Sequence, residues 1–138
     1  MTERRRRYIT TPIYYASGEP HLGHAYTTIL ADVLARFYRQ DGAEVFFLTG
    51  TDEHGSKVAR SAAAAGLSPK EFCDQISGVF RQLAGDLHAT NDFFIRTSDP
   101  QHEAFVQAFV ERMRAAGDVY EDTYAGLYCT SCEAFYTD

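Results

Sequence analysis

Apolar and polar positions along the chain predict short strands separated by helices. Tyr8–Tyr14 is rich in β-branched and aromatic residues, a composition typical of a strand. Between His24 and Gln40 the apolar residues recur at helical spacing, and Gly42 stands where a C-terminal cap belongs. Val45–Leu48 is a short continuous apolar run, which favours a strand buried in a parallel sheet.

The middle of the chain predicts two successive helices and another strand. Gly55–Ala65 has the pattern of an Ala-rich helix that ends at Gly66. Ser68–Glu71 then combines a capping box with proline at the first helical position. Phe93–Ile95 is the next strand candidate. The helix that follows the capping box carries six apolar residues on one face: Phe72, Ile76, Val79, Phe80, Leu83 and Leu87.

The last part of the chain predicts one more helix and then extended chain. The helix begins at Asp99 and Pro100 and ends at Gly117, and Val119–Cys129 looks extended. Three apolar residues of this helix are expected to turn inward: Phe105, Phe109 and Met113.

This alternation of strands and helices predicts an α/β fold with a mainly parallel sheet. Near Gly117 the composition shifts from helical sequence with Ala and Arg to Tyr, Thr, Gly and Cys. We therefore expect residues 1–117 to form one domain and residues 118–138 to begin a second.

Composition restricts the possible classes of protein further. The chain has 138 residues, 45% of them apolar, and a formal charge of −6, which argues against disorder and against a general nucleic-acid coat. No stretch approaches the ~20 apolar residues of a membrane span, and no secretory signal is visible. Three cysteines do not make a disulfide framework, which favours a reducing compartment.

His21 and His24 lie between the first predicted strand and the first predicted helix, with Gly23 between them. A helix N-terminus attracts phosphate, and imidazoles there can donate hydrogen bonds to phosphate oxygens. Gly23, which has no side chain, would let a base or sugar approach the backbone closely. The alternative is that both histidines are loop and cap residues. Placement at the carboxyl end of the first strand favours the phosphate site.

Thr49–Gly55 (TGTDEHG) follows the second predicted strand. One interpretation is that Thr51 or Asp52 caps the next helix. The other is that Asp52 points into the crevice near the histidines and binds a cationic amine. The two interpretations are compatible, because Thr51 can cap while Asp52 binds.

Cys129 and Cys132 form a CxxC motif, which is half of a tetrahedral zinc site. No second CxxC follows, and His88 and His102 lie in helical segments without matching spacing. A redox pair or two inert thiols are the alternatives. Cys73 lies on the apolar face of a helix and is expected in the core. Arg4–Arg7 is expected to be a solvated arm rather than a phosphate-binding patch.

Taken together, in this order and spacing, these segments resemble the start of the methionyl-tRNA synthetase family of class I aminoacyl-tRNA synthetases. The resemblance covers essentially the whole chain. Leucyl, isoleucyl and valyl relatives typically carry a Gly-Trp-Asp block in the segment that corresponds to Phe46–Gly55, and this chain has no Trp. The matching segments are Thr11–Gly18, Pro20–His24, Ala31–Arg39, Phe46–Gly55 and Tyr128–Glu133.

The resemblance implies the first half of a Rossmann-like nucleotide-binding fold, followed by the start of an inserted zinc-knuckle domain. It also implies a reaction: methionine reacts with ATP, which enters with Mg²⁺, to give methionyl-adenylate and pyrophosphate. The methionyl group then passes to tRNA(Met).

The resemblance assigns roles to particular residues. The ATP site would comprise His21, Gly23 and His24, and the two histidines would be catalytic. Asp52 would bind the ammonium group of methionine, in a pocket lined by Pro12, Ile13 and Tyr15, where an apolar and aromatic wall suits a polarizable thioether. The first half of the zinc site would be Cys129 and Cys132.

The chain also departs from the family pattern. It lacks the KMSKS signature, the second zinc half-site, the later part of the methionine pocket and the anticodon-binding domain, and its two lysines, Lys57 and Lys70, lie in no such motif. We therefore expect a truncated chain that forms no methionyl-adenylate alone. An uncovered apolar edge or face is expected to favour self-association. The expected location is the cytoplasm rather than an organellar matrix.

Two rival interpretations remain at this point. One is a small stand-alone nucleotidyltransferase, which would share the HxGH motif and a half-Rossmann fold. Such relatives usually carry a late Ser/Thr–Arg phosphate motif, and none occurs after residue 100. The other is a folded binding module without turnover.

Overall fold

The computed structural model describes residues 5–136. These divide into two compact units, one that ends at Ala104 and one that begins at Phe105. The elements, in chain order, are β1 (Arg6–Thr10), β2 (Tyr14–Tyr15), α1 (Leu22–Gln40), β3 (Glu44–Asp52), α2 (Ser56–Ala64), α3 (Pro69–Asp86), β4 (Phe93–Arg96), α4 (Pro100–Ala116), β5 (Tyr128–Cys129) and β6 (Ala134–Phe135).

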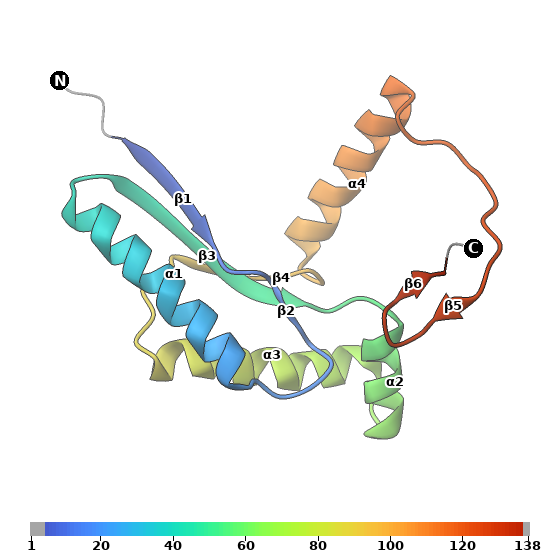
Figure 1. Ribbon diagram of the computed structural model, residues 1–138, viewed down its shortest axis with the longest axis horizontal. Helices are drawn as coiled ribbons and strands as arrows, with labels where there is room; N and C mark the ends of the chain where they lie inside the picture. The colour runs from blue at the N-terminus through green and yellow to red at the C-terminus, as the bar shows by residue number, and fades with distance from the viewer. Residues whose placement is uncertain (1–4, 137–138) are drawn as a thin grey trace. The chain divides into compact units, whose positions relative to one another are not determined.

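The first unit is built around β3, the central strand of a parallel sheet (Figure 1). β1 and β2 pair with β3 on one side, and β4 pairs with it on the other. Tyr8 lies opposite Phe46, and Leu48 lies opposite Phe93. The predicted α/β fold with a parallel sheet is confirmed.

Helices α1 and α3 cover the same face of this sheet (Figure 1). Side chains alternate between the two faces of a strand, so β3 turns Val45 and Phe47 toward the helices. Phe47 is fully buried against Ala31 and Ala35 of α1. These small residues let the helix approach the sheet closely. Further along the sheet, α3 contributes to a second cluster of buried rings: Tyr14, Phe80 and Phe94.

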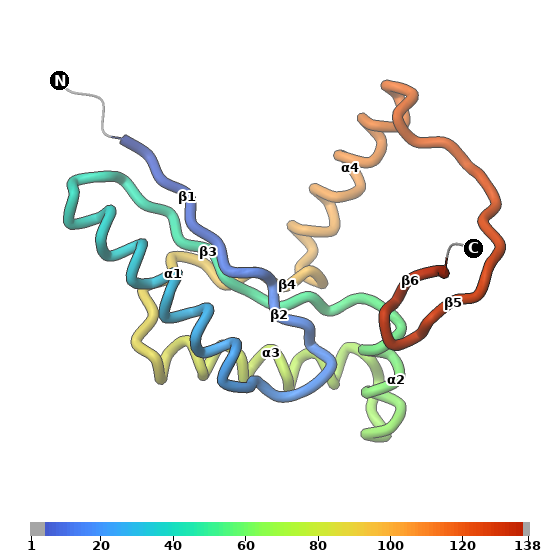
Figure 2. Tube along the Cα trace, viewed as in Figure 1, coloured from blue at the N-terminus to red at the C-terminus, as the bar shows by residue number. Residues whose placement is uncertain are grey.

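The predicted strand Tyr8–Tyr14 is in fact two short strands. β1 ends at Thr10 and β2 begins at Tyr14, and Figure 2 shows the bend between them. Pro12 lies within this break, and a proline has no N–H with which to continue the ladder. Conversely, the predicted strand Val45–Leu48 is longer, because β3 runs on to Asp52 and pairs with β2 and β4 there.

Several local predictions about the helices are confirmed. Gly42 and Gly66 adopt φ of +80° and +71°, the left-handed conformation that follows a helix end. Ser68 and Glu71 form the predicted capping box of α3. One detail is wrong: Val79 is 42% exposed, because the buried face of α3 is centred on Cys73, Ser77, Phe80 and Ala84. The expected burial of Cys73 is thus confirmed.

The apolar residues of α1 do not face the sheet. Its buried residues are small or polar: Thr28, Ala31, Asp32 and Ala35. The apolar residues whose spacing predicted the helix form an exposed ridge: Tyr26, Ile29, Leu30, Val33, Leu34 and Phe37, each at least 43% exposed. None of the helices in residues 5–136 is long and apolar enough to span a bilayer.

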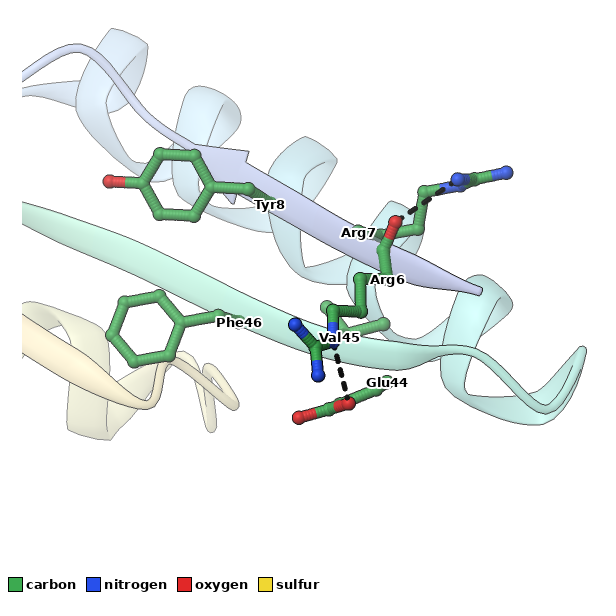
Figure 3. Close-up of a pocket in the computed structure, with 6 residues that line it drawn as sticks. All are labelled: Arg6, Arg7, Tyr8, Glu44, Val45 and Phe46. Atoms are coloured by element: carbon green, nitrogen blue, oxygen red, sulfur yellow. Dashed lines mark hydrogen bonds and ion pairs between the residues drawn. The ribbon is translucent and has the colours of Figure 1, made fainter. Parts of the chain in front are cut away.

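The sheet face opposite the helices is also apolar and exposed. Tyr8 and Phe46 lie side by side on it with ring centroids 5.9 Å apart, and the ion pair of Arg6 with Glu44 lies next to them (Figure 3). These residues line an open pocket of about 350 Å³ at the amino ends of β1 and β3. Arg6 and Arg7 belong to β1 itself, so the predicted solvated arm is in part a strand; Arg4 lies outside the described residues.

The second unit differs most from the prediction. None of the residues of α4 is buried, and Phe105 and Phe109 are 68% and 52% exposed, so the expected inward face is wrong. The rings of these two residues stack on each other 6.1 Å apart instead. Within Val119–Cys129 only β5 is a strand, and it pairs antiparallel with β6. The predicted domain boundary at Gly117 stays a prediction.

The exposed ridge of α1 generates a prediction about self-association. We expect light scattering to give a mass that rises with concentration above the 15.5 kDa of one chain, because water-exposed apolar surface favours association. Val33→Glu places a charge in the ridge and is expected to lower that mass. Gln40→Glu adds the same charge at the exposed end of α1 and should leave the mass unchanged. A monodisperse monomer at all concentrations would contradict the prediction.

Candidate functional site

The HxGH segment forms the N-terminus of α1. The helix begins at Leu22, two residues earlier than predicted, and His21 is its N-cap. The Nδ1 of His21 accepts a hydrogen bond from the backbone N–H of Gly23 at 3.1 Å. The backbone N–H of His21 donates to Nδ1 of His24 at 3.0 Å. Both imidazoles therefore cap α1, which confirms the interpretation of the two histidines as cap residues.

These capping bonds also determine which nitrogen of each ring carries the proton. A nitrogen that accepts a hydrogen bond carries no proton, so each neutral ring holds its proton on Nε2. The rings of His21 and His24 lie next to each other, with centroids 3.8 Å apart. Each Nε2–H is thus a donor beside the positive end of the α1 dipole, where an anion is favoured. The capping and phosphate-binding interpretations are compatible.

Gly23 leaves room for the His21 ring, a role that the sequence did not reveal. A Cβ at this position would lie 2.9 Å from Cε1 and 3.0 Å from Nδ1 of the His21 ring. The absence of a side chain therefore lets the His21 imidazole fold back over the first turn of α1.

Tyr15, His21 and His24 line one small pocket. Its volume is about 190 Å³, and its other lining residues are Ser17, Gly18 and Glu19. The pKa of His24 is lowered by burial and by the nearby His21, which favours the neutral ring. The ammonium of Lys57 lies over the ring of Tyr15, 5.9 Å from its centroid. The pocket thus combines ring donors, a helix N-terminus and a nearby cation.

The capping interpretation of Thr51 and Asp52 is wrong. The N-cap of α2 is Gly55, which has φ of +110° and makes no side-chain capping bond. Thr51 lies in β3, and its buried hydroxyl bonds to Glu53 at 2.8 Å and to Ser77. Because β3 continues to Asp52, these residues are sheet residues and not helix caps.

Asp52 lies next to Tyr15 across the sheet, as register partners on β3 and β2. Its Oδ1 accepts from the backbone N–H of His54 at 3.4 Å and from Oγ1 of Thr97 at 3.5 Å. These bonds are long and therefore weak. Asp52 is only half-buried, so its carboxylate can still bind a cation.

Pro12 and Ile13 stand apart from the pocket of the two histidines. Both are exposed in the bend between β1 and β2, and Ile13 is 42% exposed. The structure thus places Tyr15, His21 and His24 in one pocket and Asp52 next to Tyr15, whereas Pro12 and Ile13 do not line this pocket.

Sequence reasoning did not identify the charged network behind Asp52. The side chain of Glu53 is fully buried, and Arg96 at the end of β4 donates to both of its carboxylate oxygens, at 2.7 and 2.8 Å. Ser77 and Ser98 donate to Glu53 as well, both at 2.5 Å. Arg96 also donates to Asp74 of α3 at 2.6 Å. The only sequence signal was a charged residue directly after an apolar strand.

This network sets the ionisation of Glu53. Burial alone would raise the pKa of the carboxyl group, but the hydrogen bonds from Arg96 and from the Ser77, Ser98 and Thr51 hydroxyls outweigh burial and hold the pKa at about 2. The same pairing raises the pKa of Arg96. Glu53 is therefore a carboxylate at all ordinary pH values.

Close packing between β3 and β4 at Gly50 also contributes to the Glu53–Arg96 network. A Cβ on Gly50 would collide with the backbone oxygen of Ile95 in β4. Glycine at this position lets the two strands approach, which brings Arg96 within reach of Glu53.

The CxxC motif lies at the turn between β5 and β6 in the second unit. The backbone N–H of Cys132 donates to Sγ of Cys129 at 3.4 Å. This bond and the neighbouring N–H of Ser131 lower the pKa of Cys129 to about 7. A thiolate is the form that zinc binds. Within residues 5–136, however, no three His, Cys, Asp or Glu side chains gather to hold a metal.

The sequence matches a known family over nearly its whole length. The family described as tRNA synthetases class I (M) matches residues 7–138. The chain belongs to this family. The match confirms the resemblance inferred from the HxGH, TGTDEHG and CxxC segments.

Two relatives similar to this chain are methionine–tRNA ligases. A methionine–tRNA ligase of Thermotoga maritima is 55% identical over 131 residues, which are 95% of this chain and 21% of the relative. The chloroplastic/mitochondrial methionine–tRNA ligase of Arabidopsis thaliana is 55% identical over 92% of this chain and 21% of its own length. The chain thus spans about a fifth to a quarter of the length of the curated relatives that it matches.

Solved structures show the same fold. A Mycobacterium tuberculosis methionyl-tRNA synthetase in complex with methionyl-adenylate superposes with a TM-score of 0.93 at 45% identity, over 97% of this chain and 26% of that one. A LeuRS of Agrobacterium radiobacter superposes with a TM-score of 0.83 at 20% identity, a likeness of fold alone. The Rossmann-like fold class is confirmed.

The buried Glu53 generates a prediction about acid stability. Its pKa is about 2 when folded and near the ordinary 4.5 when unfolded, so the unfolded chain takes up a proton first as the pH falls. The stabilisation is therefore complete above pH 4.5 and disappears between pH 4.5 and 2, a loss of about 3 kcal/mol in the free energy of unfolding. Urea unfolding across this range should show the loss.

Glu53→Gln should remove that part of the acid dependence. Glu44→Gln, which breaks the exposed pair with Arg6 at the start of β3, should leave it intact. The same acid dependence in wild type and Glu53→Gln would contradict the assignment.

Proposed function

We propose that the chain carries ATP- and methionine-binding residues of a methionine–tRNA ligase. The observation that supports this most strongly is the 45% identity, over 97% of the chain, to a methionyl-tRNA synthetase in complex with methionyl-adenylate. In the proposed reaction a carboxylate oxygen of methionine attacks the α-phosphorus of ATP. The bond from the α-phosphorus to the bridging oxygen breaks, and pyrophosphate leaves.

The proposed role of the two histidines follows from their capping bonds. With Nδ1 occupied by a backbone N–H, the Nε2–H groups of His21 and His24 are free to donate to phosphate oxygens as negative charge develops. The N-terminus of α1 adds its dipole to the same site. Gly23 leaves room for the His21 ring and donates its backbone N–H to Nδ1 of that ring. ATP is expected to enter with Mg²⁺.

The proposed methionine site lies beside the HxGH segment. Asp52 would pair with the ammonium group, and Tyr15 would contact the substrate next to it, because the two are register partners. Ile13 and Pro12 would add the apolar wall for the thioether. This chemistry positions two reactants and stabilises charge, so it needs no nucleophilic side chain on the protein.

The CxxC motif is proposed to supply two of the four ligands of a structural zinc ion. The lowered pKa of Cys129 supports this use, because the metal binds thiolates. The tRNA partner is proposed from the family as a whole.

A hybrid enzyme tests the proposed function. We would replace the matching stretch of the Thermotoga maritima methionine–tRNA ligase with residues 7–136 of this chain and measure methionine-dependent ATP–pyrophosphate exchange. The hybrid is expected to be active. Asp52→Asn should raise the KM for methionine about a hundredfold, because it removes the charge that pairs with the ammonium group. His21→Asn keeps a capping oxygen but loses the ring donor, so it should lower kcat.

One outcome would count against the proposed function, and another against the expected inactivity of this chain by itself. A hybrid that is folded but exchanges no pyrophosphate with methionine would overturn the function. Robust exchange by residues 1–138 alone would overturn the expectation that this chain is inactive by itself.

Cobalt titration of the chain tests the proposed metal ligands. Thiolate-to-cobalt absorption bands are expected, with an intensity appropriate to two thiolates. Cys129→Ser should lower the intensity by at least about half, because one of the two thiolates is lost, whereas Cys73→Ser, a change at a buried core thiol, should not. An intensity unchanged by Cys129→Ser would refute the assignment.

A further inference from the structure

The Glu53–Arg96 network lies one residue beyond Asp52, the residue proposed to hold the substrate ammonium. Its carboxylate is fully buried, receives both arms of one guanidinium and accepts further bonds from three hydroxyl groups. Burying charge carries a large desolvation penalty, and apolar residues of similar volume are often no worse for stability. Stability alone therefore does not account for the network.

The backbone around Asp52 is tied to the same network from both sides. The backbone N–H of Glu53 donates to Oγ1 of Thr97 at 2.8 Å, and the backbone N–H of Thr97 donates to the carbonyl of Thr51 at 3.1 Å. Thr97 directly follows Arg96, so one short segment holds the residues before and after Asp52. The same Thr97 hydroxyl also reaches Oδ1 of Asp52 at 3.5 Å.

Alternation along the chain links the two carboxylates. Thr51 and Glu53 turn toward α3, where their oxygens meet the hydroxyl of Ser77. Asp52, between them, must point the opposite way. A rigid, bidentate pair at Glu53 therefore fixes the direction of the neighbouring Asp52 side chain.

A glutamate–arginine pair at the start of β3 shows by comparison how the Glu53–Arg96 pair differs from an exposed one. Glu44 pairs with Arg6 at 3.4 Å through a single contact, with side chains 64% and 85% exposed. Exposed pairs of this kind contribute little to stability or geometry. The buried, forked pair occurs at the end of β3 where the candidate site lies.

We propose that Glu53 and Arg96 form a positioning unit that holds the carboxylate of Asp52 for the ammonium group of the amino-acid substrate. Neither residue touches substrate in this proposal, and both act through Asp52. The inference rests on the proposed function, since it presumes that Asp52 binds an amino acid.

The first test measures KM values in the hybrid enzyme. Glu53→Gln is expected to raise the KM for methionine about tenfold and to leave the KM for ATP within about twofold, because only the ammonium partner is displaced. Arg96→Lys keeps the charge but loses the fork, and should give a smaller change in the same direction. Glu44→Gln is the matched control and should change neither KM. An unchanged KM for methionine in folded Glu53→Gln overturns the proposal.

A double variant separates positioning from stability. Glu53→Gln leaves Arg96 without its carboxylate partner, which can unfold the protein. Glu53→Gln with Arg96→Met removes both charges and is expected to regain thermal stability while the KM for methionine stays raised. If the KM for methionine returns to the wild-type value together with stability, the pair is a structural element only and the proposal is wrong.

A third measurement does not depend on substrate. In the 138-residue chain, hydrogen exchange of the Glu53, His54 and Thr97 amides should accelerate in the double variant about tenfold, with the amides of α1 unchanged. Unchanged exchange at these three amides would overturn the positioning role even if the chain binds no methionine. If exchange accelerates but the hybrid shows no methionine-dependent pyrophosphate exchange, the proposed function is wrong, and the effect of the pair on the backbone around Asp52 stands.

Discussion

The parallel pairing of β3 with strands on both sides is the constraint on which the candidate site depends. In a parallel sheet the carboxyl ends of all strands lie at one edge, and ligands of open α/β folds bind there. β2 ends at Tyr15, β3 at Asp52 and β4 at Arg96. One register therefore brings together the segment that leads into the HxGH turn, a candidate ammonium partner and the arginine that holds the neighbouring glutamate. The large open pocket at the amino ends of β1 and β3 has no comparable set of groups.

Folding and chemistry use the same polar groups at this edge. The backbone N–H donors at the start of α1 need acceptors, and the imidazoles of His21 and His24 supply them through Nδ1. Because Nδ1 accepts these bonds, the proton stays on Nε2, and Nε2 is the atom that can donate to a phosphate. Glu53 likewise serves as an acceptor for Arg96 and as a fixed point beside Asp52. A substitution at these positions therefore changes stability and ligand binding together, and the two effects must be separated by experiment.

The helices of the first unit cover one face of its sheet, and this follows from chain topology. Right-handed connections from β1 to β3 and from β3 to β4 advance in one direction across the sheet, so they place α1 and α3 on the same side. The opposite face presents the rings of Tyr8 and Phe46, and α1 presents an apolar ridge. Parallel sheets are ordinarily covered on both faces. In this chain, which spans about a fifth to a quarter of the length of its curated relatives, these apolar surfaces are exposed.

Local patterns in the sequence determined the helices, the capping box of α3, the glycine turns at Gly42 and Gly66, the parallel sheet and the place of the HxGH and CxxC motifs, because capping boxes, glycine turns and periodicity act over a few residues. The tertiary structure decided which faces of the elements pack together and which distant residues meet, because local patterns hold no information about either. The apolar period of α1 predicts a helix but not which side meets the sheet, and the small residues Ala31 and Ala35 occupy that side. Thr51 had the composition of a helix cap and is a buried strand residue, since β2 and β4 pair beyond Leu48. Glu53 and Arg96 are 43 positions apart, and only the pairing of β3 with β4 brings one charge to the other.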